Sequence, residues 1–200
     1  MEKNIFPENL KILQELVSSF PGIGKKNAVR IVLHLLNLPD ENQKKLGEII
    51  SSLNSDISYC KTCHYFSFDG ICPICSDTKR DNNIICVVEN YSDIFALESS
   101  GFNGNYHILG GVISPLQGIG TDDLNISSLI SRCTSSKEII LALGLGTEGE
   151  ITMHYLVDEI RKEYPNIKIS RLAYGLPAGA NLEYCDAKTL HAAINNRTTL

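Results

Sequence analysis

The hydrophobic positions of the first 56 residues recur at intervals of three and four, which predicts amphipathic helices. A Pro21-Gly22-Ile23-Gly24 segment interrupts the pattern and predicts a turn between the first two helices. A third helix is predicted over residues 40–53, with Asp40 as its N-cap. The residues that recur at helical spacing are Leu10, Leu13, Leu16 and Val17 in the first helix and Ala28, Ile31, Val32 and Leu35 in the second. In the third helix we expect Leu46, Ile49, Ile50 and Leu53 to face inward.

After residue 82 the pattern changes to short, continuous apolar runs, as expected for strands that are buried on both faces. Helical patterns alternate with these runs, and a short helix is predicted over 186–195. This alternation predicts an α/β fold with a mostly parallel sheet. The runs lie at 84–88, 106–109, 138–143 and 167–172, and the helical patterns near 91–99, 124–133 and 149–163.

The composition is that of a globular chain with a real core, because 43% of the residues are apolar and 20% are charged. The longest nearly continuous apolar stretch, 139–145, is far too short to span a bilayer. The first residues carry Glu2, Glu8 and Glu15 and lack an apolar signal core. We therefore expect a cytoplasmic protein that has no membrane partner and keeps its cysteines reduced.

Four of the seven cysteines form the pattern Cys60-x2-Cys63-x8-Cys72-x2-Cys75. Each pair can chelate from one tight turn, and four thiolates complete a closed tetrahedral shell, which predicts one structural zinc ion per chain. The alternative is four unrelated thiols, but the segment has few apolar residues and needs the folding energy of a metal. His64 disturbs the paired spacing and is excluded as a ligand. The other cysteines are expected to be small core residues: Cys86, Cys133 and Cys185.

The net charge of −5 lies entirely in residues 83–200, which carry 8 basic and 13 acidic side chains. No anion stands between residues 15 and 40, where the cations are Lys25, Lys26 and Arg30. Because salt screens charges beyond about 8–10 Å, this basic element can bind phosphate on an acidic protein.

The turn at 21–24 carries the features of a phosphate-binding helix-hairpin-helix. Gly22 and Gly24 allow the backbone to approach a phosphate, and the N–H groups that open the next helix point toward it. Lys26 and Arg30 are four residues apart and therefore share one helical face. Such contacts grip DNA without reading its sequence. The alternative is a plain turn between two helices with solvated charges.

Three glutamates follow predicted strands: Glu89 after the first, and Glu148 and Glu150 after the third. In an open α/β sheet chemistry gathers beyond the carboxyl ends of the strands, where carboxylates can hold Mg²⁺. The alternative is that Glu148 and Glu150 only open a helix near 149, where negative charge favours the helix dipole. Composition alone favours this alternative.

In their order along the chain, these elements resemble the bacterial RecR family of recombination mediators. The hairpin at 21–30 and the four cysteines at 60–75 precede a toprim-like region. The family blocks in and after that region are 85–89, 109–120, 147–150, 171–179 and 182–186. The resemblance divides the chain into a helix-hairpin-helix region at 1–56, a four-cysteine zinc finger at 57–80, a toprim domain at 83–179 and a C-terminal segment at 180–200.

The chain departs from the family pattern at a few positions. Gly144-Leu145-Gly146 stands where the family usually has Asn-Pro-Thr, which changes the backbone beside Glu148 and Glu150. Asn27 replaces a usual Ser or Thr, and Ala180 a usual Gly or Ser. Lys25 is an additional cation where the family often has Pro.

The resemblance implies a non-enzymatic role in DNA repair, close to the nucleoid. Such proteins form ring-like clamps, with dimers pairing to tetramers, that encircle single- or double-stranded DNA regardless of sequence. With RecO and RecF they help to load RecA onto single strands. By resemblance, Lys26 and Arg30 match the family's DNA-contacting positions. Together with Gly22, Gly24 and the additional cation Lys25 they are the candidate DNA-binding residues. The toprim acidic set of Glu89, Glu148 and Glu150 is associated with partner docking.

The competing class is a Mg²⁺-dependent toprim enzyme such as a nuclease, a primase or a topoisomerase-like protein. Against it, the chain has no room for a second catalytic domain with a nucleophilic tyrosine or a polymerase fold. A zinc-dependent hydrolase is excluded by the closed four-thiolate shell.

Overall fold

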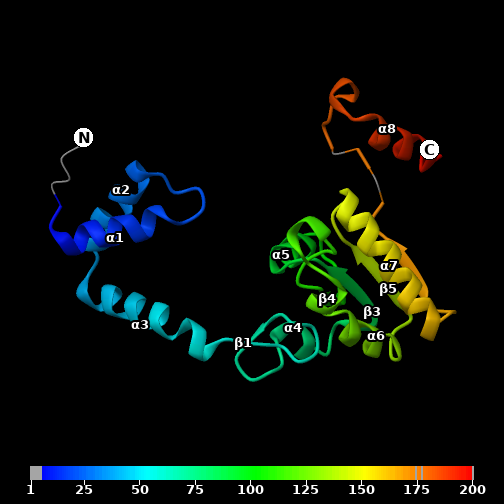
Figure 1. Ribbon diagram of the computed structural model, residues 1–200, viewed down its shortest axis with the longest axis horizontal. Coiled ribbons are helices and arrows are strands. Elements are labelled where there is room, and N and C mark those ends of the chain that lie inside the picture. The colour runs from blue at the N-terminus through cyan, green and yellow to red at the C-terminus, as the bar shows by residue number, and fades with distance from the viewer. Residues whose placement is uncertain (1–5, 174, 177, 200) are drawn as a thin grey trace. The chain divides into compact units, whose positions relative to one another are not determined.

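The computed structural model describes residues 6–173, 175–176 and 178–199, which form two compact units (Figure 1). The first unit ends at Ile57 and the second begins at Ser58. Tyr174 and Pro177 of the 171–179 block lie outside the described residues, as does Glu2. Each unit has hydrophobic clusters of its own, so each is described by itself.

In the first unit, α1 (Glu8–Ser18) and α2 (Lys25–Leu36) pack together as predicted. Their common core consists of the buried Val17, Ala28 and Val32. Gly22 has a φ of 77°, a backbone conformation that favours glycine and allows the sharp turn between the helices. Leu16, by contrast, is 59% exposed.

Helix α3 (Asp40–Asp56) forms as predicted, but its apolar stripe does not face inward. No residue of α3 is buried. Helices α1 and α2 pack with each other, and α3 is joined to the end of α2 through the Gln43 side chain, which donates to the Leu35 carbonyl oxygen at 2.8 Å. Asp40 is the first helical residue and Pro39 occupies the N-cap position, so the predicted N-cap is also wrong. The exposed fractions are 39% for Leu46, 50% for Ile49, 59% for Ile50 and 44% for Leu53.

The second unit is built on a parallel four-stranded sheet, which confirms the predicted α/β class. The strand order is β4-β3-β5-β6, with β3 and β5 in the centre. The strands are β3 (Asp81–Val88), β4 (Gly104–Ile108), β5 (Glu138–Ala142) and β6 (Lys168–Arg171). The helices are α5 (Tyr91–Ser99), α6 (Ile126–Cys133) and α7 (Thr147–Glu163), and each lies within two residues of its predicted bounds.

Successive residues of the central strands point to opposite faces of the sheet, and each face has its own core. Ile85 and Val87 join a cluster with side chains of α6 and α7. Cys86 and Val88 join a second cluster with Ile94 of α5. Figure 1 shows α7 and α5 on different sides of the sheet. Burial on both faces explains the continuous apolar runs in the sequence.

The edge strand β4 is buried along its whole length because a cysteine-rich segment covers it. This segment contains β1 (Ser58–Tyr59), β2 (Phe66–Ser67) and α4 (Pro73–Ser76), and we call it the cysteine hairpin, residues 58–76. Its Tyr65 and Ile74 pack on the Cys86 face of the sheet. The Ile108 amide donates a hydrogen bond of 3.0 Å to the Cys63 carbonyl oxygen. The Arg80 and Arg132 side chains donate to the Gly104 and Tyr106 carbonyl oxygens, so the cysteine hairpin and two arginines together bond backbone groups of the edge strand.

After β6 the described chain continues through a short 3₁₀ turn, Leu182–Tyr184, to α8 (Ala187–Asn195). The Asp186 side chain accepts a hydrogen bond of 2.9 Å from the Thr189 amide and so caps α8. Within the described ranges, none of the helices has the length and apolarity required to span a membrane.

Candidate functional site

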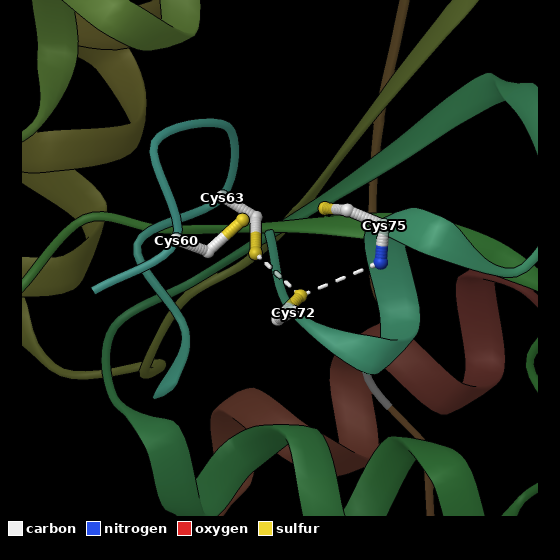
Figure 2. A group of neighbouring side chains, drawn as sticks. All are labelled: Cys60, Cys63, Cys72 and Cys75. Atoms are coloured by element: carbon white, nitrogen blue, oxygen red, sulfur yellow. Dashed lines mark hydrogen bonds between the residues drawn. The ribbon is translucent and has the colours of Figure 1, made fainter. Parts of the chain in front are cut away.

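The four cysteines of the predicted motif converge in the cysteine hairpin (Figure 2). Their sulfur atoms all lie within 4.8 Å of one another. Cys60 and Cys63 come from the loop between β1 and β2, whereas Cys72 and Cys75 come from the start of α4 and from α4 itself. Three of the four side chains are fully buried, and Cys75 is partly buried.

The geometry fits a tetrahedral metal ion with four thiolate ligands. Four sulfurs at a zinc–sulfur distance of about 2.3 Å stand about 3.8 Å apart, close to the arrangement found here. The Cys63 and Cys72 sulfurs are 3.4 Å apart. The amides of Tyr65 and Cys75 each donate to a cysteine sulfur, at 3.4 Å in both cases. Such N–H···S bonds stabilise thiolates, and hydrogen bonds from Cys63 and Cys75 lower the pKa of Cys72.

His64 is not part of this cluster, as the spacing predicted. It has a φ of 66°, the left-handed region in which few residues other than glycine are found. Its Nε2 atom lies 2.8 Å from the Ser128 hydroxyl on α6. His64 therefore connects the cysteine hairpin to the sheet domain. Sequence reasoning missed this contact because 64 residues separate the two partners.

The remaining cysteines divide into two kinds. Cys86 and Cys133 are buried in the two sheet cores, as predicted. Cys185 is partly exposed and its thiol donates to the Asn181 carbonyl oxygen at 3.5 Å. The expectation that Cys185 is a core residue is wrong, because it lies at the end of a short turn and not on a packed face.

Gly22 lies in the turn before α2 and Gly24 at its N-cap, whereas Lys25 and Lys26 lie in the first turn of α2 and Arg30 in the second. Gly24 occupies the N-cap position in extended conformation and provides no side-chain cap. The three cations are exposed, and no carboxylate pairs with them among the described residues. The first turn of α2 thus presents backbone N–H groups and positive side chains together, as an anion site requires.

The acidic residues gather at the carboxyl edge of the sheet, and each one has a partner. The Gly144 amide donates to Glu89, and the Ser114 hydroxyl donates to Glu148. Glu150 lies 3.3 Å from the Arg171 guanidinium of β6. Glu148 and Glu150 also occupy the first turn of α7, where negative charge favours the helix dipole. Ser114 and Arg171 stood in the quoted sequence blocks, but no local spacing predicts these long-range pairs.

The Gly144-Leu145-Gly146 departure has a structural explanation. A Cβ atom at residue 144 would lie 2.8 Å from the Glu89 Oε1 atom, in the space that this carboxylate now fills. A Cβ atom at residue 149 would overlap with the Gly144 carbonyl oxygen. Two glycines therefore allow α7 to start directly against the loop after β5, with Glu89 bonded to the loop backbone.

The parallel sheet, the acidic edge and the adjoining four-cysteine cluster define a toprim-domain protein with a candidate structural metal centre. Residues 83–173 match the model of the toprim domain, and residues 175–198 match the model of the RecR C-terminal region.

Curated relatives identify the family. The chain is 41% identical over 197 residues to the recombination protein RecR of Desulforapulum autotrophicum, covering 97% of this chain and 98% of that one. It is 44% identical over 195 residues to the RecR protein of Cytophaga hutchinsonii, covering 94% of each chain. It is 41% identical over 201 residues to the RecR protein of Oenococcus oeni, covering 98% of this chain and 99% of that one. The chain belongs to the RecR family, as the sequence blocks indicated.

The close approach of Gly149 and Gly144 yields a stability test. We expect Gly149→Ala to lower the free energy of unfolding of the second unit by about 3 kcal/mol, because its methyl group has no space. Gly146→Ala is the matched control from the same loop, since no atom lies within 4 Å of a Cβ there, and it should change stability by less than about 1 kcal/mol. Denaturant unfolding followed by circular dichroism measures both. Equal effects would show that the two backbones do not constrain each other.

Proposed function

We propose that this protein is a non-enzymatic recombination mediator in the cytoplasm: an oligomeric DNA clamp that works with RecO and RecF to load RecA onto single-stranded DNA. The observation that carries the proposal is the first half of α2, where three exposed cations and uncapped backbone N–H groups have no neutralising carboxylate in the described parts of the chain. Membership in the RecR family supports the role, because the relatives are named recombination proteins.

We expect DNA binding to be independent of sequence because of the chemical groups that residues 21–30 present. Backbone N–H groups and flexible cations bind phosphate oxygens, which are the same at every base pair. The acidic excess of residues 83–200 does not cancel this attraction at distances beyond the screening length of about 8–10 Å. A few contacts from one chain bind weakly, but several linked copies make the later contacts intramolecular and raise the overall affinity.

Assembly into a dimer or tetramer is supported by the exposed apolar surface of the first unit. The α3 stripe of Leu46, Ile49, Ile50 and Leu53 is not covered by any described part of the unit. Leu16 and Phe20 of the α1 region are exposed as well, by 59% and 56%. Large apolar patches of this kind are rare on monomers and mark interfaces. We propose that a second copy of the chain covers this surface.

We propose that the cysteine cluster binds one structural Zn²⁺ ion per chain. Cys60, Cys63, Cys72 and Cys75 would hold it, and the ion would supply folding energy to a hairpin with little apolar core of its own. With four protein ligands the shell has no open position for a substrate, so we assign the ion no catalytic role.

We propose that Glu89, Glu148 and Glu150 form a docking surface for a basic partner, the RecO-like protein. Acidic groups at one sheet edge steer a positively charged partner and sharpen specificity. The second candidate is a Mg²⁺-dependent toprim enzyme, and a Mg²⁺-dependent DNA cleavage or relaxation assay distinguishes it from the clamp. The pairing of each carboxylate with an internal group favours docking over metal binding.

The zinc proposal is tested by metal analysis. We expect one zinc per folded chain, and we expect Cys63→Ala to make the protein unstable or insoluble, because it leaves an incomplete shell. Cys185→Ala, outside the cluster, is the matched control and should retain both zinc and solubility. A zinc content well below one per folded wild-type chain would contradict the proposal.

The DNA proposal is tested by removing two cations from the helix-hairpin-helix, residues 21–30. Lys26→Ala with Arg30→Ala should weaken binding equally for unrelated sequences and reduce the salt slope by roughly 1–2 units. Lys44→Ala with Lys45→Ala removes the same charge from α3 and should have a smaller effect. Binding is measured by fluorescence anisotropy at several salt concentrations. If the variant with Lys26→Ala and Arg30→Ala assembles normally and binds DNA with unchanged affinity, residues 21–30 are only a structural turn.

The assembly proposal is tested by analytical ultracentrifugation. We expect the wild-type chain to sediment as a dimer or tetramer, and Ile49→Lys with Leu53→Lys to sediment as a smaller species, because two charges cannot enter an apolar interface without cost. Ser51→Lys with Ser55→Lys, exposed residues on the other side of α3, provides the control. A wild-type chain of 22.1 kDa that stays monomeric at every concentration, with and without DNA, would refute the proposal.

The docking proposal is tested with Glu148→Gln and Glu150→Gln together. The double variant should fold, assemble and bind DNA but lose its partner and the loading of recombinase, because shape is kept and charge is removed. Glu159→Gln with Glu163→Gln, at the other end of α7, is the control and should keep the partner. Pull-down measures capture. Normal capture by the first variant would reject the docking surface, and a DNA-cleaving activity lost in that variant would favour the enzyme.

A further inference from the structure

One partly buried charged group of the second unit has no carboxylate partner among the described residues. Arg132 of α6 directs its Nη1 atom inward, where it donates to the Tyr106 carbonyl oxygen at 2.7 Å and to His107 Nδ1 at 3.1 Å. Neither acceptor carries a negative charge. Across the described parts of the chain, Asp and Glu form four ion pairs with basic groups, and Arg132 belongs to none of them. A shielded cation of this kind needs a counter-charge.

The uncharged state of His107 follows from its hydrogen bonds. Because an arginine has only donors, His107 Nδ1 must accept from Arg132, and the proton then sits on Nε2, which donates to the Asn125 carbonyl oxygen at 2.8 Å. Burial, together with the nearby guanidinium, lowers the pKa of His107 to about 3. The imidazole is therefore neutral. It accepts a hydrogen bond from Arg132 and adds no charge beside it.

The cysteine hairpin and Arg132 bind the same stretch of β4: the Cys63 carbonyl oxygen accepts from the Ile108 amide, and Arg132 donates to the Tyr106 carbonyl oxygen two residues away. Burial lowers the pKa of Arg132, and the main electrostatic influences that oppose this come from Cys75, Cys63 and Cys60. The hairpin is also joined to the strand beside Arg132. The His107 and His64 rings are in edge-to-face contact, with 5.3 Å between their centroids. Arg132 and the thiolate cluster thus face the same junction between the hairpin, β4 and α6.

We propose that Arg132 is the counter-charge of the metal–thiolate centre and thereby ties the cysteine hairpin to the edge of the sheet. A divalent ion with four thiolates carries a net charge of −2, which is costly in a buried site unless a cation lies nearby. Arg132 offsets one of these charges from a different element of the fold. It is a positioning residue: it binds no DNA and no metal, and it stabilises the loaded hairpin through charge. The inference rests on the proposed metal binding.

Three substitutions separate charge from hydrogen bonding. Arg132→Lys keeps the charge and a donor, Arg132→Gln keeps a donor without charge, and Arg132→Met keeps neither but fills similar space. The rate at which zinc passes from the folded protein to a chromogenic chelator is measured for each. We expect the Gln and Met variants to release zinc about tenfold faster than wild type, and the Lys variant to stay within about threefold. Arg161→Met, an exposed arginine on α7, is the control and should match wild type.

The outcomes are distinct. If Arg132 acts only as a hydrogen-bond donor to Tyr106, the Gln variant will resemble the Lys variant, and the counter-charge is refuted. Equal release from all variants refutes it as well. If the Met variant does not fold, the comparison of Gln with Lys decides alone. A wild-type chain that holds no zinc refutes the metal proposal itself, so the two failures are distinguishable.

Discussion

The second unit depends on one constraint, which is that the outer edge of β4 must be covered. An edge strand exposes unpaired backbone groups, yet all five residues of β4 are buried. The cover is the cysteine hairpin, through the Ile108–Cys63 hydrogen bond and through Tyr65 and Ile74 on the sheet. The hairpin has little apolar core and relies on its sulfur cluster for shape. The sheet edge and the four-cysteine cluster therefore form one structural element.

The N-terminal ends of two helices, α2 in the first unit and α7 in the second, carry side chains of opposite charge, and each arrangement arises from local structure. In the first unit, the N-terminus of α2 adds its uncapped N–H groups to three exposed cations. In the second, the N-terminus of α7 gathers carboxylates because the helix dipole and the strand ends both favour negative charge. The same property of helices thus supports a phosphate-binding site in one unit and a surface for a basic partner in the other. The charge of the side chains, positive in α2 and negative in α7, decides which kind of partner each helix end attracts.

The sequence predicted those features that depend on residues close together in the chain. The continuous apolar runs identified the strands because the parallel sheet is buried on both faces, and the cysteine spacing identified the cluster because each pair shares one turn. The periodicity of α3 was read as burial, yet the stripe is exposed, since periodicity indicates an apolar face and not what covers it. The partnerships of Ser114 with Glu148 and of Arg132 with His107 join residues far apart in the chain, which no spacing rule can find.

The contact between Glu89 and residue 144 decides where one carboxylate of the sheet edge points. The Glu89 carboxylate fills the space where a side chain at position 144 would begin, and it is bonded to the Gly144 amide. A side chain at position 144 would displace this carboxylate, which is the far end of a flexible side chain and can rotate away. The displaced Glu89 would lose its bond to the loop backbone and present its full charge to the surroundings, so the residue at position 144 sets how strongly Glu89 is held.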